Sequence, residues 1–483
     1  MGHRGPHVVR VSRGCHEQQS ICRGDRVTAT IDTNSGSKGG DNKGGDESGA
    51  VLRDLGAAQI CAAWAQADVA DDYVVYEREN RWVFAGGRRA SVVLTTDEVV
   101  TTIGTESTSR AWSGLPAGAI SAALAGLPFP HWRVYGWIAF DFCAPGLGAG
   151  DHLTAGSVLA HLVVPEFEAW VEPDGIRVEG GGDELAERLR EMAARAPHSH
   201  PVSPSPLPVD DDPSDYRGRV AKAVAEIHRG DYEKVIISRG VDVPFDVDIA
   251  ATYSEGRKKN NPARSFLLRL GGLEAAGFSP ELVGSVDANR RIVTEPLAGT
   301  RAFGRSPELD AAARAELESD SKEIVEHAVS VRTSFTEVQS VALPGTTAVT
   351  EFMVVRERGS VQHLASTVQG TLAPEFGPWD ALEVLFPSVT ASGIPKPAAV
   401  DAIYRLEDTR RGLYSGAVLT ASSEGELEAA LALRTVFREG GRSWVRAGAG
   451  IVGQSSPERE FIETCEKLGS IAPYLVERTS DDR

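Results

Sequence analysis

The sequence lacks the features of a membrane protein and of a disulfide-stabilised protein. It contains no run of about 18 apolar residues, the length that a helix needs to cross a bilayer. Its five cysteines, at positions 15, 22, 61, 143 and 465, are too few and too scattered for a disulfide framework or for a zinc site with paired spacings. We therefore expect a cytoplasmic protein that has no membrane partner.

Positive charge is also scarce. The chain carries 50 Lys and Arg against 68 Asp and Glu, so its formal net charge is −18 at pH 7. This excess of carboxylates opposes the long-range attraction that nucleic acid or an anionic membrane would require, and we expect neither as a partner. If the ligand is itself an anion, positive groups or a metal ion must be concentrated at one place in the molecule.

The sequence also lacks the standard phosphate-binding and dinucleotide-binding motifs. Two glycine-rich stretches, residues 296–304 (PLAGTRAFG) and 446–453 (RAGAGIVG), miss the Gly-Lys-Ser/Thr ending of a phosphate loop and the Gly-x-Gly-x-x-Gly spacing of a dinucleotide site. Glycine in such turns still allows backbone N–H groups to approach an anion closely. These stretches are therefore weak candidates for ligand contact.

The chain is long enough, at 483 residues, for two domains or one large domain, and 41% of its residues are hydrophobic. Residues 1–49 combine a basic start with a Gly/Ser/Asn/Asp stretch, which predicts a disordered extension. The rest mixes strand and helix patterns without regular βαβ alternation, which favours an α+β fold with antiparallel sheets. The proline-rich residues 193–216 form either a linker or a surface connection.

Two predicted helices carry pairs of glutamates on one face. Glu323 and Glu326 follow a capping Ser319 or Asp320, and a second pair follows Ser456 and Pro457. That second pair is Glu460 and Glu463. Residues three apart share a helix face, and carboxylate oxygens are the ligands that Mg²⁺ prefers. Spacing alone favours the interpretation that both pairs are solvated surface carboxylates, with Glu463 pairing Lys467 four residues later.

Three further side chains have a chemical and a structural interpretation. Lys234 opens an apolar strand, where it either extends its amine to solvent or, when desolvated, acts as a general base. Glu281 follows Pro280 in an apolar run, where burial would let it donate a proton at neutral pH, although it could be a strand-end charge. Arg434, in the predicted strand ALALRTVF, needs either a substrate carboxylate or a structural acid as its partner.

The order of ten segments resembles the chorismate-utilising enzyme family, which includes anthranilate, aminodeoxychorismate, isochorismate and salicylate synthases. The segments are EKVIISR, SPELV, TEPLAGTRA, SKEIVEHAVSVR, ERGSVQHLAST, FPSVTASGIPKPAAV, RGLYSGAV, ALALRTVF, RAGAGIV and PEREFIETCEKL. The resemblance covers residues from about 214 to the C-terminus, and more weakly those from about 70. It implies one α+β domain over residues 50–477, with two large antiparallel sheets packed as a sandwich among helices. The proline-rich stretch is then a surface loop.

The resemblance also implies roles for individual residues. Lys234 matches the general base that activates water to attack C2 of chorismate, and Glu281 matches the general acid that protonates the departing C4 hydroxyl. Glu326 and Glu463 match ligands of a Mg²⁺ cofactor, with Glu323 and Glu460 beside them in its outer shell. The positions that match substrate contacts or line the pocket are Gly299, Thr300, His363, Thr390, Tyr414, Arg434, Gly448, Ala449, Gly450 and Lys467.

The lysine indicates the branch of the family. Relatives that admit ammonia resemble one another in lacking this base, so Lys234 implies that water is the nucleophile and that no glutamine amidotransferase subunit is needed. The segments VTASGIPK, RERGSVQHL and RGLYSGAV resemble the siderophore-type salicylate synthase branch, whose members resemble monomers. We therefore expect conversion of chorismate to isochorismate and then to salicylate and pyruvate. The alternatives are an isochorismate synthase without the lyase step and a non-catalytic protein that binds chorismate-like anions or a partner.

Overall fold

Ten strands of the described residues form one antiparallel sheet, which we call sheet A. The computed structural model describes residues 56–196, 203–358 and 361–478, so the predicted extension over residues 1–49 lies outside the described residues. In spatial order the strands are β18 (Gly393–Ile394), β10 (Lys234–Val243), β22 (Arg442–Ile451), β21 (Thr435–Glu439), β12 (Leu273–Ser279), β11 (Arg264–Leu270), β1 (Tyr73–Arg78), β2 (Arg81–Gly86), β8 (Phe167–Glu172) and β9 (Gly175–Gly180).

The second antiparallel sheet, sheet B, contains the remaining strands that the structure describes. Their order is β15 (Leu297–Ala302), β17 (Val361–Thr371), β14 (Arg291–Thr294), β13 (Leu282–Val286), β20 (Leu427–Leu431), β19 (Ala417–Ser422), β6 (Arg133–Ile138), β7 (Val158–Val164), β3 (Ala90–Thr95), β4 (Glu98–Ile103) and β5 (Glu106–Ala111). An extra strand, β16 (Ala348–Arg358), pairs with β17.

Strand β1 shows how the two sheets pack. Its alternate residues point to opposite faces, as a strand requires. Tyr73 and Val75 join a core with helices on the outer face of sheet A, whereas Val74 and Tyr76 join a core that also contains β6 and β19 of sheet B. The strand is therefore buried on both sides. The predicted α+β sandwich of two antiparallel sheets is confirmed.

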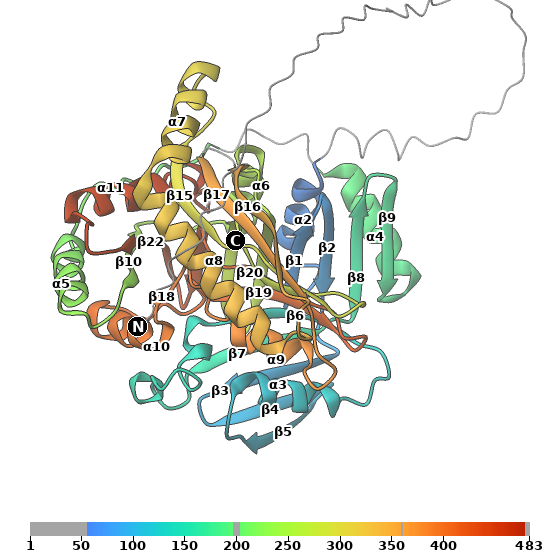
Figure 1. Cartoon of the computed structure of the whole chain (residues 1–483). Coiled ribbons are helices and arrows are strands. Elements are labelled where there is room, and N and C mark those ends of the chain that lie inside the picture. Colours follow the sequence, from blue (N-terminus) through green and yellow to red (C-terminus); the bar gives the residue numbers. More distant parts are fainter. Residues whose placement is uncertain (1–55, 197–202, 359–360, 479–483) are drawn as a thin grey trace, which may run out of the picture. The chain divides into compact units, whose positions relative to one another are not determined.

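Helices cover the outer faces of the sandwich. They are α2 (Ala57–Gln66), α3 (Pro116–Ala125), α4 (Gly182–Arg195), α5 (Tyr216–Arg229), α6 (Ile249–Lys259), α7 (Pro307–Ser319), α8 (Ser321–Val341), α9 (Pro378–Leu385), α10 (Lys396–Leu406) and α11 (Pro457–Leu468), with short 3₁₀ helices η1 (Phe140–Cys143), η2 (Gly150–His152) and η3 (Ala472–Tyr474). Helix α8 lies across β15, β16 and β17, and α11 packs on β22 (Figure 1).

Part of the proline-rich stretch is bonded to the C-terminal segment through its backbone. Residues 203–215 of the proline-rich stretch contain no helix or strand, and the backbone N–H groups of Ser205 and Leu207 donate to Leu475 and Ala472 near the C-terminus. Among the described residues, no helix is both long and apolar enough to cross a membrane.

Candidate active site

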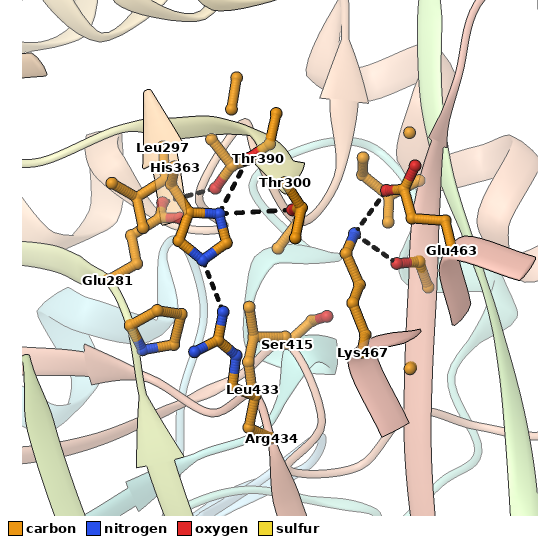
Figure 2. Close-up of a pocket in the computed structure, with 18 of the residues that line it drawn as sticks. Glu281, Leu297, Thr300, His363, Thr390, Ser415, Leu433, Arg434, Glu463 and Lys467 are labelled. Atoms are coloured by element: carbon orange, nitrogen blue, oxygen red, sulfur yellow. Dashed lines mark hydrogen bonds and ion pairs between the residues drawn. The ribbon is translucent and has the colours of Figure 1, made fainter. Parts of the chain in front are cut away.

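One pocket, at the end of the sandwich where α8 and α11 meet β10 and β22, collects most of the residues that the sequence predicts as functional (Figure 2). Fourteen of them line it: Lys234, Glu281, Gly299, Thr300, Glu323, Glu326, His363, Thr390, Tyr414, Arg434, Gly448, Gly450, Glu463 and Lys467. The two others lie behind the lining. Ala449 turns its side chain into the apolar core because neighbours along a strand alternate in direction, and Glu460 is buried beside Lys322.

Lys234 reaches the pocket because of its place at the start of β10. Val235 and Ile237 pack into the apolar core, so the alternate residues Lys234 and Ile236 face the pocket. The lysine is only 4% exposed, which excludes an amine that extends to bulk water. Its Nζ lies 2.7 Å from Oε1 of Glu326 on α8. The pocket thus holds a desolvated primary amine.

Glu281 lies in the short segment between β12 and β13. The backbone there is fixed because its carbonyl accepts hydrogen bonds from Ser279 Oγ (2.9 Å) and from the N–H of Leu431 (3.1 Å). Its carboxyl Oε1 accepts hydrogen bonds from Ser388 and Thr390. Burial raises the pKa of Glu281 to about 7, although the two hydroxyls and the charge of Lys234 act to lower the pKa. A carboxyl with such a pKa can carry a proton at neutral pH.

The glutamate pairs lie in the first two turns of two helices whose caps match the prediction, and all but Glu460 line the pocket. Asp320 accepts hydrogen bonds from the N–H groups of Lys322 and Glu323, and Ser456 accepts one from Arg459. Glu323 is only 9% exposed, and burial together with the charges of Glu326 and Glu463 raises its pKa to about 7. These carboxylates are crowded and shielded, so they are not solvated helix faces.

Lysines neutralise part of this carboxylate cluster, which consists of Glu323, Glu326, Glu460 and Glu463. Besides the Lys234–Glu326 pair, Lys322 Nζ lies 3.3 Å from Glu460, and Lys467 Nζ lies 2.9 Å from Glu463. The predicted pair between Glu463 and Lys467 therefore forms, but inside the pocket. The lysine side chains thus lie between the carboxylates. In the described part of the chain, no group of three metal-ligating side chains is close enough together to hold a metal ion.

The donor chemistry of the cluster nevertheless suits a hard divalent cation. All of its ligating atoms are carboxylate oxygens, which Mg²⁺ prefers. Oε2 of Glu460 is buried without a hydrogen-bond partner among the described residues, which is costly for an acceptor. Burial and Glu463 both raise the pKa of Glu460, which marks an excess of negative charge. An added cation would relieve that excess.

Arg434 and His363 form the opposite wall (Figure 2). Nδ1 of His363 lies 2.8 Å from the carbonyl of Gly299, which can only accept, so Nδ1 donates. Nε2 must then accept, and Arg434 donates to it over 2.6 Å. Burial and the charge of Arg434 lower the pKa of His363 to about 3. His363 is therefore a neutral imidazole that orients a guanidinium.

The structure corrects the predicted strand around Arg434 and, among the described residues, places no structural acid beside it. Arg434 has a φ of +51° and lies between β20 and β21, where the chain crosses from sheet B to sheet A. A left-handed backbone at a residue other than glycine is strained and is often found at functional sites. Among the described residues no carboxylate pairs with Arg434, and burial lowers its pKa to about 10. The guanidinium is thus available to an anionic ligand.

Close packing explains the glycines of β22. A Cβ on Gly450 would lie 2.9 Å from Oε1 of Glu326 and 3.3 Å from Cε of Lys234, so any side chain would displace the Glu326 carboxylate and the Lys234 side chain. The carbonyl of Gly448 accepts a hydrogen bond from Lys467 Nζ over 2.9 Å, and the phenol oxygen of Tyr414 lies beside it. This strand therefore presents backbone atoms to the pocket.

The sequence analysis missed a buried ionic triad behind the pocket. Glu407 accepts hydrogen bonds from Arg411 and Arg446, and also from the N–H and Oγ of Ser238 on β10. Arg446 lines the pocket and Arg411 donates to the carbonyl of Ile236. Burial raises the pKa of Glu407, but the two arginines hold it below its ordinary value. The triad anchors the strand that carries Lys234.

We expect Glu407→Gln to destabilise the protein by about 3–5 kcal/mol, because it leaves two buried guanidinium groups without a counter-charge. Denaturant unfolding followed by circular dichroism measures this change. The exposed pair between Glu466 and Arg459 provides the matched control, and Glu466→Gln should cost no more than about 1 kcal/mol. Equal effects of the two substitutions would show that the triad does not anchor the strand.

Other residues of the site were missed for a common reason. The polar residues Lys322, Ser388 and Arg446 lie in segments where nearby residues were predicted as functional instead. Glu323 was predicted next to Lys322, and Thr390 was predicted near Ser388. The sequence was enough to predict whether each of them lies in a helix, a strand or a loop. Their contacts depend on elements distant in the sequence: Glu460 lies 138 residues from Lys322, and Glu407 lies 39 residues from Arg446.

Comparisons with known proteins agree with this geometry. The family model described as chorismate binding enzyme matches residues 72–473. A salicylate synthase of Mycolicibacterium paratuberculosis is 49% identical over 409 residues, which cover 84% of this chain and 90% of that protein. Anthranilate synthase component 1 of Aeropyrum pernix is 38% identical over 54% of this chain and 59% of its own length.

Solved structures show the same fold. The crystal structure of anthranilate synthase component I from Streptococcus pneumoniae superposes with a TM-score of 0.66 at 25% identity, and the match covers 81% of this chain and 92% of that one. A menaquinone-specific isochorismate synthase from Escherichia coli superposes with a TM-score of 0.65 at 21% identity, covering 86% and 90% of the two chains.

Proposed function

The chain belongs to the chorismate-binding enzyme family, and on that basis we propose that it is a salicylate synthase, which converts chorismate to isochorismate and then to salicylate and pyruvate. The observation that carries the proposal is one pocket that combines a desolvated amine, Lys234, with a buried carboxyl that can be protonated at neutral pH, Glu281. A base and an acid in one enclosed site are what an exchange of hydroxyl groups on a ring requires.

In the first half-reaction, Lys234 removes a proton from a water molecule whose oxygen forms a bond to C2 of the ring. The ring double bonds shift, the C4–O bond breaks with its electron pair, and Glu281 donates a proton to the departing oxygen. One water molecule enters and one leaves, so the reaction is an isomerisation. General acid and base groups of this kind each contribute about 10²–10⁴-fold to a rate.

Arg434 and Tyr414 bind the pyruvyl carboxylate, together with the backbone of Gly448, Ala449 and Gly450. The guanidinium has no carboxylate partner among the described residues, which supports this assignment because a planar bidentate donor matches a carboxylate, and His363 keeps it oriented. Lys467, Gly299 and Thr300 contact the rest of the substrate, and Thr390 lines the pocket beside Glu281. The positive charge that an acidic protein needs for a dianion is thus concentrated at this site.

We propose Mg²⁺ as the cofactor, held by Glu326 and Glu463, with Glu323 and Glu460 in its outer shell. The carboxylate donor set and the buried, unpartnered oxygen of Glu460 support this choice. When bound, the ion supplies charge neutralisation and orientation for the ring carboxylate. Of the lysines that now pair with these acids, Lys322 and Lys467 are partly exposed and have room to move aside for an ion, whereas Lys234 is buried beside Glu326.

The second half-reaction, loss of pyruvate from bound isochorismate, is pericyclic and needs a fitted, dry pocket more than another acid or base. The neutral His363 suits such a site, because it neither donates nor takes up a proton near pH 7. With Lys234 as base, water is the nucleophile and the enzyme works without an amidotransferase subunit. We propose that it does so as a cytoplasmic monomer.

The purified protein is expected to produce salicylate when incubated with chorismate and Mg²⁺, and salicylate fluorescence measures the product. Chromatography of the same mixture detects isochorismate. If isochorismate alone accumulates, the protein lacks the lyase step; if chorismate is unchanged, the protein is a binder. Added ammonium should yield no anthranilate, whereas anthranilate formation would contradict water as the nucleophile.

A further inference from the structure

Ser388 is a buried hydroxyl that contacts Glu281 from outside the lining of the pocket. It lies in the loop between α9 and β18. Its Oγ donates to Oε1 of Glu281 over 2.6 Å, and Thr390 Oγ1 donates to the same oxygen over 2.5 Å. The two hydroxyl oxygens are also only 2.7 Å apart. One carboxyl oxygen therefore receives two donors.

The number of hydrogens available shows what this arrangement does. Each hydroxyl carries one hydrogen, so when both donate to Oε1 no hydrogen remains for another acceptor. The described residues provide no hydrogen-bond partner for Oε2, while Glu281 itself lines the pocket. An acid proton on Oε1 would compete with two donors, whereas one on Oε2 would not. When both hydroxyls donate to Oε1 rather than one to the other, the proton of neutral Glu281 lies on Oε2.

The loop that carries Ser388 is held firmly in place. The Ser388 carbonyl accepts hydrogen bonds from the N–H of Ala391 and from Oγ of Ser392, both over 2.9 Å. Arg411 of the buried triad donates to the carbonyl of Ala391 over 2.7 Å, and the N–H of Ile236 on β10 donates to the carbonyl of Ser392 over 2.8 Å. The loop that orients the acid is thus bonded to the strand that carries the base.

We propose that Ser388 is a positioning residue for proton donation: with Thr390 it holds Oε1 of Glu281 as an acceptor, so that Oε2 delivers the proton to the departing C4 hydroxyl. This inference rests on the proposed function. As the C4–O bond breaks, the proton moves from Oε2 to the leaving oxygen, and Glu281 becomes a carboxylate. The two hydroxyls then stabilise the negative charge that forms.

The charges around Glu281 predict how the acid responds to the loss of Ser388. Lys234 on β10 favours the ionised form, whereas burial and Glu295, between β14 and β15, favour the neutral form. The hydroxyls of Ser388 and Thr390 add to the effect of Lys234. Removing one hydroxyl should therefore raise the pKa of Glu281. Because the acid works when protonated, activity falls as the pH rises through this pKa, and the fall should move to higher pH.

The test compares Ser388→Ala with the unmodified enzyme in the pH dependence of kcat for chorismate. We expect the basic limb of the profile to move up by about one pH unit, a tenfold change in the acid dissociation constant, because a hydrogen bond to a charged group is lost. On the plateau kcat should fall about tenfold, since the carboxyl is less well oriented. KM should change little, because Ser388 does not line the pocket.

Three variants separate this role from a structural one. Ser388→Thr keeps the hydroxyl and should restore the original profile. Ser392→Ala removes the hydroxyl that bonds the Ser388 carbonyl but keeps the other three hydrogen bonds of the loop and both donors to Glu281, so it should leave the basic limb in place. If Ser388→Ala does not fold, Ser388→Cys, a much weaker donor, should give the same upward shift.

Two outcomes would overturn the inference: an unmoved basic limb in folded Ser388→Ala, or an equal shift in Ser392→Ala. Conversion of supplied isochorismate to salicylate, which uses no acid, should stay near that of the unmodified enzyme, and an equal loss of this step would also count against the role. A failure of the proposed function is distinguishable, because the unmodified protein itself would then not consume chorismate.

Discussion

Lys234→Ala is expected to lower the rate of chorismate consumption by about 10³-fold, while supplied isochorismate is still converted to salicylate. The amine is the only basic nitrogen that the strand β10 presents to the pocket, and general bases contribute about 10²–10⁴-fold. Loss of pyruvate from isochorismate needs no base. Salicylate fluorescence with each of the two substrates in turn measures both half-reactions of the same variant.

Lys258→Ala is the matched control for this experiment. Lys258 lies on α6 outside the pocket, and its ammonium pairs with Glu255. Its removal should change neither half-reaction. Equal loss of both half-reactions in Lys234→Ala would contradict the base role, because it would show that the lysine mainly keeps Glu326 and the pocket wall in place.

Local patterns predicted the parts of the site that depend on helix geometry. Residues three apart on an α-helix share a face, so the pairing of Glu460 with Glu463 could be read from spacing. Their capping residue Ser456 was equally readable, because a serine before a proline and an acidic turn is typical of a helix start. The order of ten segments supplied the family and with it the sandwich of two antiparallel sheets.

The order of the strands in the sheets could not be predicted from local patterns. Lys234 faces Gly450 only because β10 pairs with β22, although these strands lie more than 190 residues apart in the chain. Strand pairing at such separation depends on how all the other strands are arranged, and no local pattern encodes it. The same holds for Arg434, which was predicted within a strand and instead forms a strained bend where the chain changes sheets.

Buried polar contacts were the least predictable part. Nothing in the sequence distinguishes Glu407 from the other acidic residues. In the structure it accepts hydrogen bonds from two arginines and from Ser238 of β10. Ser388 appears as a common loop residue, yet it donates a hydrogen bond to the buried carboxyl of Glu281. A buried polar group must find a partner, but which partner it finds depends on the packed fold.

Glu463→Gln is expected to abolish measurable Mg²⁺ binding and to lower the activity with chorismate by at least about 10²-fold at any Mg²⁺ concentration. An amide is uncharged, so it offers a divalent cation one weak oxygen instead of a carboxylate. The loss should be large because the proposed ion would supply several kcal/mol of charge stabilisation. Calorimetric titration with Mg²⁺ in the absence of substrate measures binding independently of turnover.

Glu458→Gln is the control that decides what the first result means. Glu458 lies on the same helix, α11, but it is exposed and pairs with Arg217 outside the pocket. It should leave both the titration and the activity unchanged. Glu326→Gln should behave like Glu463→Gln in the Mg²⁺ titration, because the two acids enter the pocket from different helices and each variant would remove one ligand of a shared ion. An unaltered Mg²⁺ titration in both pocket variants would mean that these acids serve only as partners for Lys234 and Lys467.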